Sequence, residues 1–189
     1  TTTYFAANVL DALLDRPDLF EAIRADRPLV PRLLQEVLRI AGPAVQKPRE
    51  FSHADIIRRF KRAEVVAVNQ CSGNRRGLFS PHIPGVQWGY GAMGNAAWSG
   101  VRLKDVLEDA GLAAGALEVV ADGADAPTLT GPDFVKSLPM WKALDADTLI
   151  AFEMNGEPLP VWNGAPARIV APGWTATYWI KALADLTVT

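Results

Sequence analysis

Residues 64–111 read EVVAVNQCSGNRRGLFSPHIPGVQWGYGAMGNAAWSGVRLKDVLEDAG, and this stretch combines three different local patterns. The apolar run at residues 65–68 predicts a short buried strand that leads into Cys71. A long glycine-rich loop follows the cysteine. Apolar residues then recur at i, i+3, i+4 and i+7, which predicts a helix at residues 103–111 with Gly111 as its stop. The order of strand, cysteine, loop and helix places Cys71 at the end of the strand and the start of the loop.

Cys71 is the only cysteine of the chain, and Arg75 and Arg76 follow it closely. A thiolate is a soft metal ligand and a nucleophile. Arginine presents a planar set of donors that matches an oxyanion. This neighbourhood therefore indicates a soft metal or an attacking sulfur beside an anion site. The alternative is a buried structural cysteine that acts as a small hydrophobic side chain.

The motifs around Cys71 resemble the molybdopterin domain of the sulfite oxidase family, most closely that of bacterial sulfite dehydrogenases. The resemblance rests on QCSGNRR at 70–76, WG at 88–89, GAMGNA at 91–96 and WSGVRL at 98–103. It continues through DFVKSL at 133–138, AFEMNGEPLP at 151–160, PAR at 166–168, PGW at 172–174 and YWIK at 178–181. It thus covers residues 52–189 and implies a mixed α/β or α+β molybdopterin fold. That fold is expected in truncated form, because the family's C-terminal immunoglobulin-like domain has no counterpart before Thr189.

The resemblance also implies a cofactor and a set of site residues. In that family the cysteine matching Cys71 ligates molybdenum beside the dithiolene of one pterin, so molybdenum and molybdopterin are the expected cofactors. The catalytic candidates are Arg76, which matches an arginine that helps to bind the oxyanion, and Phe152, which stands where a tyrosine is expected. The residues implied to contact the cofactor are Cys71, Ser72, Asn74, Arg168 and Lys181.

The implied reaction is the oxidation of sulfite, or of another small oxyanion, at the molybdenum centre, with electrons passed to a c-type cytochrome. A periplasmic location is implied as well. Two alternatives stay open. One is a molybdopterin-dependent reductase of sulfoxides, which shares the cysteine-ligated centre. The other is a catalytically inactive hybrid that serves as an interaction module, which bound molybdenum would exclude.

Residues 1–48 carry a different pattern. Apolar stripes followed by Gly42-Pro43 predict an all-helical segment. This segment resembles the central helices of heme-thiolate cytochrome monooxygenases, in which Glu36 and Arg39 would match a Glu-x-x-Arg ion pair. The heme-ligating cysteine loop of that family does not follow, so no heme function is assigned. The expected organisation is therefore a helical segment at 1–48 joined to a molybdopterin-binding domain at 52–189.

Short elements are expected between residues 52 and 189. Ser52, with Asp55 at the third position, predicts the cap of a short helix at 52–62. Strands are expected at 117–121, 148–154, 168–171 and 184–188. The dipeptide Asn155-Gly156 predicts a type I′ hairpin turn.

Composition excludes several classes of function. The chain has 189 residues, of which 49% are apolar and 21% charged, so one globular domain with a core is expected. The net charge of −2 gives no general attraction to nucleic acid or to an anionic membrane. The basic run at 58–62 lacks the interleaved aromatic residues of a nucleic-acid platform. No apolar run approaches the roughly 20 residues of a membrane span.

Overall fold

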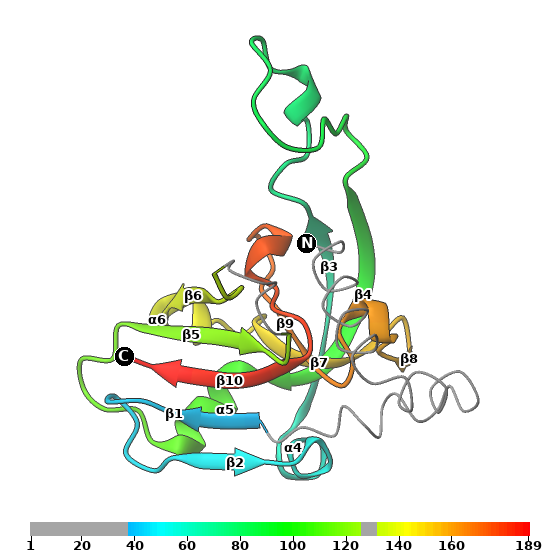
Figure 1. Ribbon diagram of the computed structural model, residues 1–189. Helices are drawn as coiled ribbons and strands as arrows, with labels where there is room; N and C mark the ends of the chain where they lie inside the picture. The colour runs from blue at the N-terminus through cyan, green and yellow to red at the C-terminus, as the bar shows by residue number, and fades with distance from the viewer. Residues whose placement is uncertain (1–37, 126–131) are drawn as a thin grey trace, which may run out of the picture.

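The computed structural model describes residues 38–125 and 132–189, and these form two sheets with short helices (Figure 1). The first sheet has the strand order β2-β1-β10-β5-β6, and the second has the order β3-β4-β7-β8 with β9 paired to β7. The fold is therefore mixed helix and sheet, as the sequence predicted. Helices expected within residues 1–37, and with them Glu36, lie outside the described residues.

The strands of the first sheet are β1 (Leu38–Ala41), β2 (Arg49–Phe51), β5 (Glu118–Gly123), β6 (Lys136–Pro139) and β10 (Leu183–Val188). Those of the second are β3 (Arg62–Gln70), β4 (Met93–Arg102), β7 (Leu149–Met154), β8 (Glu157–Pro158) and β9 (Arg168–Val170). The α-helices are α4 (His53–Arg59), α5 (Leu103–Ala110) and α6 (Met140–Ala143). The 3-10 helices are η1 (Arg76–Leu78), η2 (Val161–Asn163) and η3 (Ala176–Tyr178).

The prediction of an all-helical segment up to residue 48 is wrong for residues 38–48, because β1 occupies part of this range. β1 pairs in parallel with β10 and antiparallel with β2. Leu38 and Ile40 are buried while Arg39 points outward, which is the period of two that defines a strand. Arg39 donates from Nε to Asp185 Oδ2 of β10 at 2.6 Å, which joins β1 to its parallel partner by a side-chain contact. β1 and β2 thus belong to the same sheet as β10.

The two helices expected before β3 and after β4 are confirmed. Ser52 caps α4, and Asp55 completes the capping box by accepting from the Ser52 backbone N–H. In α5, the buried side chains are the four of the apolar pattern, Leu103, Val106, Leu107 and Ala110. Gly111 then ends α5 in the left-handed region, with φ of 75°. The hairpin turn between β7 and β8 is also confirmed, with positive φ at Asn155 and Gly156.

β3 and β4 extend beyond the remaining elements and carry residues 71–92 at their tip (Figure 1). We call residues 71–92 the tip loop, and we call the two sheets with their helices the body. The strand expected at 65–68 is confirmed, but its burial is not, since Val66 is 65% exposed and Val68 is 45% exposed. β3 is an edge strand, because among the described residues it pairs only with β4.

The body has one continuous apolar core to which both sheets contribute. Its fully buried side chains include Ile40 of β1, Leu107 of α5, Ile150 of β7 and Leu186 of β10. None of the helices in the described residues has both the length and the apolar character that a membrane crossing requires.

Candidate functional site

A cavity of about 1130 Å³ separates the tip loop from the body. Five of the residues predicted from the sequence line it, namely Cys71, Ser72, Arg76, Arg168 and Lys181. The tip loop supplies the first three, and the last two come from β9 and the segment before β10. The fold therefore brings together residues that are about a hundred positions apart in the sequence.

Cys71 lies directly after β3 at the entrance to the tip loop. Its backbone N–H donates to the carbonyl oxygen of Ala92 at 2.9 Å. Its Sγ accepts from the N–H of Gly73 at 3.4 Å, and its side chain is half-buried. The sulfur is thus oriented by the backbone while it remains open to the cavity.

Asn74 does not line the cavity. Its side-chain oxygen accepts from the N–H of Ala92 at 3.1 Å. This bond joins the two limbs of the tip loop, namely the part that follows β3 and the part that leads into β4. Backbone bonds from Arg75 to Gly89 at 2.8 Å and from Gly77 to Trp88 at 2.9 Å join the same limbs. Asn74 therefore helps to keep the loop closed next to the cysteine.

Arg168 carries a buried charge at the body side of the cavity, with 4% of the residue exposed. Its guanidinium donates to the carbonyl oxygens of Asn163 at 2.9 Å, Trp179 at 3.0 Å and Ile169 at 3.5 Å. It also lies over the rings of Trp98 and Trp179, at 5.1 and 5.7 Å from their centroids.

No carboxylate among the described residues forms an ion pair with Arg168. Burial lowers the pKa of Arg168 to about 10. Three of the five guanidinium N–H groups donate to carbonyl oxygens, so two donors have no acceptor among residues 38–125 and 132–189. A buried cation with spare donors and no carboxylate partner favours the binding of an anion.

Lys181 adds a second cation next to Arg168. Its Nζ donates to the carbonyl oxygen of Trp162 at 2.8 Å. Burial lowers the pKa of Lys181, the charge of Arg168 lowers it further, and Asp125 opposes both effects. Among the described residues, four cationic and two carboxylate side chains line the cavity, so the charge of this lining is positive on balance. They are Arg76, Lys136, Arg168 and Lys181 against Asp125 and Asp133.

Lys136 was not singled out from the sequence, although it lies in the run DFVKSL that carried part of the resemblance. The signal for it was therefore present. Because β6 and β9 belong to different sheets, its position near Arg168 follows only from the fold.

Phe152 does not join the other predicted site residues. It is 6% exposed within β7 and belongs to the core. Its ring meets the ring of His53 edge-on at 5.7 Å, and the guanidinium of Arg62 lies 5.8 Å from its centroid. The structure thus places Phe152 outside the lining of the cavity.

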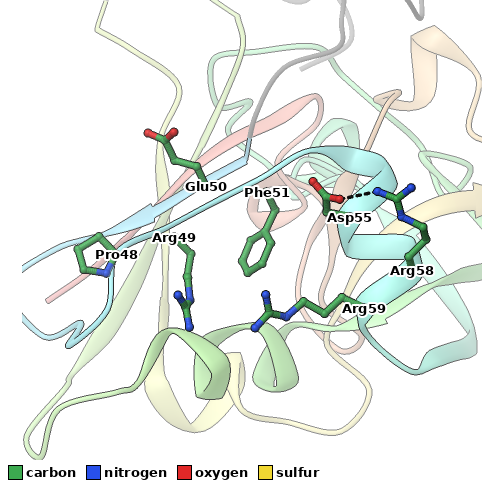
Figure 2. A pocket seen from close by; sticks show the side chains of 7 residues that line it. All are labelled: Pro48, Arg49, Glu50, Phe51, Asp55, Arg58 and Arg59. Atoms are coloured by element: carbon green, nitrogen blue, oxygen red, sulfur yellow. Dashed lines mark hydrogen bonds and ion pairs between the residues drawn. The ribbon is translucent and has the colours of Figure 1, made fainter.

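A second hollow, of about 490 Å³, is lined by arginines of β2 and α4 (Figure 2). Arg49 and Arg59 both bind Asp109, at 3.1 and 2.6 Å, and Arg58 binds Asp55 at 2.6 Å. Each of these guanidinium groups already has a carboxylate partner, and no thiol is present. The cavity beside Cys71 is therefore the candidate site.

No group of three or more His, Cys, Asp or Glu side chains that could enclose a metal ion occurs among residues 38–125 and 132–189. A metal bound to Cys71 would accordingly take its other ligands from a cofactor. The positive lining and the soft sulfur fit an anionic cofactor that carries its own metal ligands.

Comparisons with known proteins point the same way. A sequence model described as the oxidoreductase molybdopterin binding domain matches residues 30–189. The chain is 39% identical over 140 residues to mitochondrial sulfite oxidase of Mus musculus, and 34% identical over 151 residues to a nitrate reductase [NAD(P)H] of Hordeum vulgare. These alignments cover 71% and 76% of this chain, but only 26% and 17% of the two relatives.

A solved structure is similar as well, that of the sulfane dehydrogenase SoxCD from Paracoccus pantotrophus. It aligns with a TM-score of 0.71 and 34% sequence identity, over 82% of this chain and 38% of that one. The chain thus spans well under half the length of these three proteins.

Proposed function

Because the chain belongs to the oxidoreductase molybdopterin-binding domain family, we propose that it acts in a molybdenum-dependent oxidation of sulfite to sulfate. One observation carries the proposal: the thiol of Cys71 and the buried guanidinium of Arg168 line the same cavity. Sulfur is a soft ligand of the kind that such a metal centre uses, and a cation without a carboxylate suits an anionic cofactor.

The residues present fit molybdopterin. Cys71 would ligate the metal, Arg168 and Lys181 would bind anionic groups of the cofactor from the body side, and Ser72 would contact it from the tip loop. The cofactor, when bound, supplies the two-electron oxygen-atom transfer. The protein contributes ligand, orientation and charge.

Arg76 would bind the sulfite oxyanion. Its side chain is half-buried at the wall of the cavity that also contains Cys71. A guanidinium can form charge-assisted hydrogen bonds to two oxygens of an oxyanion, and it can offset the negative charge that develops during the reaction.

On the sequence resemblance alone, the proposal extends to a c-type cytochrome as electron acceptor and to a periplasmic location. Fractionation of the native host, with an antibody against the chain, would read the location directly.

The test is a metal analysis of protein produced in a host that makes molybdopterin. We expect about one molybdenum per chain, and sulfite turnover that Cys71→Ser abolishes while the circular dichroism spectrum is unchanged. Asn95→Ser is the matched control, because Asn95 is exposed on β4 and does not line the cavity. A wild-type protein without molybdenum, or full sulfite turnover by Cys71→Ser, would contradict the proposal. Turnover of nitrate or of a sulfoxide in place of sulfite would change the substrate but keep the cofactor.

A further inference from the structure

Two glycines of the tip loop lie against the guanidinium of Arg76. A Cβ added at Gly73 would stand 2.6 Å from Nη2 and 2.7 Å from Cζ of Arg76. A Cβ added at Gly85 would stand 2.3 Å from Nη1 and 2.8 Å from Cζ. All four distances are far below van der Waals contact, so only residues without a side chain leave room for the guanidinium here.

The two glycines reach Arg76 from separate parts of the loop. The backbone N–H of Arg76 donates to the carbonyl oxygen of Gly73 at 2.9 Å, and Arg75 adopts the left-handed conformation with φ of 68°. This tight turn brings the Arg76 side chain back over Gly73.

Gly85 is presented by a second turn, in which its own φ is +113°. The side-chain amide of Gln87 donates to the carbonyl oxygens of Ile83 and Gly85, both at 2.8 Å, and so stabilises that turn. Next to it, Nη1 of Arg76 donates to the carbonyl oxygen of Val86 at 3.3 Å. The guanidinium is thereby fixed to both turns.

We propose that Gly73 and Gly85 are positioning residues, which form a slot that orients the Arg76 guanidinium toward an oxyanion in the cavity. The inference rests on the proposed function in one respect, since it takes Arg76 as the anion-binding group. A guanidinium that is already ordered loses less conformational freedom when it binds an anion. Widening or filling the slot should therefore weaken anion binding.

The slot can be filled without rebuilding the loop. The atoms that a new Cβ would meet at Gly73 belong to the far end of a flexible side chain, and Gly73 does not have a positive φ. Alanine at this position should therefore displace the guanidinium and leave the backbone in place. Gly89→Ala is the matched control, because a Cβ there has nothing within 4 Å and Gly89 does not line the cavity.

The experiment measures the dissociation constant of inorganic sulfate by calorimetry on the purified full chain, beside its melting temperature. Arg76→Gln should weaken sulfate binding by about ten- to a hundredfold, the range for a hydrogen bond to a charged group. Gly73→Ala should weaken it by about three- to tenfold, as expected when one long side chain must be ordered on binding. Gly89→Ala should bind sulfate like the wild type.

A double variant separates positioning from a general effect on the loop. If Gly73 acts through Arg76, then Gly73→Ala should cause no further loss of sulfate affinity in the Arg76→Gln background. Full additivity of the two losses would overturn the inference, and so would a Gly73→Ala affinity equal to that of Gly89→Ala.

A second pair of variants keeps the inference testable if Gly73→Ala does not fold. Gly85→Ala and Gly115→Ala both place alanine at a positive φ, of +113° and +92°, but only the first meets Arg76. Both should lower the melting temperature similarly, and only Gly85→Ala should weaken sulfate binding. Equal sulfate affinities in this pair would refute the slot.

Failure of the proposed function would look different. In that case Arg76→Gln itself would leave sulfate binding unchanged, or the wild type would bind no sulfate. If Arg76→Gln weakens binding while both glycine variants match their controls, the anion site stands and the positioning role is wrong.

Discussion

The body and the tip loop are stabilised in different ways. Body strands bury side chains completely, as with Ile150 of β7 and Leu186 of β10. The tip loop has exposed apolar side chains, such as Phe79 at 58% and Tyr90 at 69%, and its two limbs are joined by backbone hydrogen bonds. Substitutions of buried body side chains should therefore change stability, whereas substitution of a loop side chain that lines the cavity should change binding at nearly constant stability.

The largest effect is expected in the body. Ile150→Ala should lower the free energy of unfolding by about 2–5 kcal/mol, because the side chain is fully buried on β7, the strand that pairs with both β4 and β9. Val66→Ala, at an exposed position of β3, should change it by less than about 0.5 kcal/mol. Urea denaturation measures both. Similar losses in the two variants would show that burial does not determine which side chains stabilise the body.

Arg76→Gln should show the opposite behaviour. Removing a charge-assisted contact should lower kcat/KM for sulfite by an amount equivalent to about 1.5–3 kcal/mol of transition-state stabilisation. The free energy of unfolding measured with urea should change little. The kinetic loss should be greater at low ionic strength, because salt screens the attraction to the substrate. Unchanged sulfite kinetics would mean that the loop does not provide the anion site.

A smaller effect, on the pH dependence of folding stability, is expected at His53 of α4. Burial lowers the pKa of His53, and a backbone contact with Pro166 opposes this only in part. The unfolded chain then binds more protons than the folded chain, so stability should fall as the pH drops below about 6.5.

His53→Phe should remove this part of the acid sensitivity, which urea denaturation at neutral and mildly acidic pH would show. Asp122 and Asp125, whose pKa values are raised mainly by burial, contribute in the opposite direction but are common to both proteins. An equal loss of stability on acidification in the variant and the wild type would assign the effect to other groups.

The smallest kinetic effect is expected at Phe152. Phe152→Tyr should leave kcat/KM for sulfite within about twofold of the wild type, because the ring packs against His53 and does not line the cavity. Steady-state kinetics on the loaded enzyme decides this. A gain of about fivefold or more would show that the hydroxyl reaches the reacting groups.

The sequence predicted elements well where a local pattern determined them. The apolar period of α5, the capping box of α4 and the Asn155-Gly156 turn all depend on neighbours within a few residues, and all three are observed. β1 was missed because its four residues follow an apolar helical pattern, while its strand conformation depends on pairing with β10, far away in the sequence.

The same distinction applies to the site. Motif resemblance identified five residues that line one cavity, but it could not show that Arg168 is buried with no ion pair to any carboxylate of the described residues. It also placed Phe152 among the catalytic candidates, since an apolar strand position gives no sign of the direction in which its side chain points. Gly73 and Gly85 carried no signal, because their role depends on where the Arg76 side chain lies.

The central claim is that Cys71 binds molybdenum in the cavity between the tip loop and the body. X-ray absorption at the molybdenum edge, on wild type and Cys71→Ser loaded in the same host, tests this most directly. We expect one sulfur neighbour fewer around the metal in Cys71→Ser than in the wild type, because the substitution replaces the soft thiolate sulfur by a hard oxygen. An identical number of sulfur neighbours in the two proteins would contradict the claim.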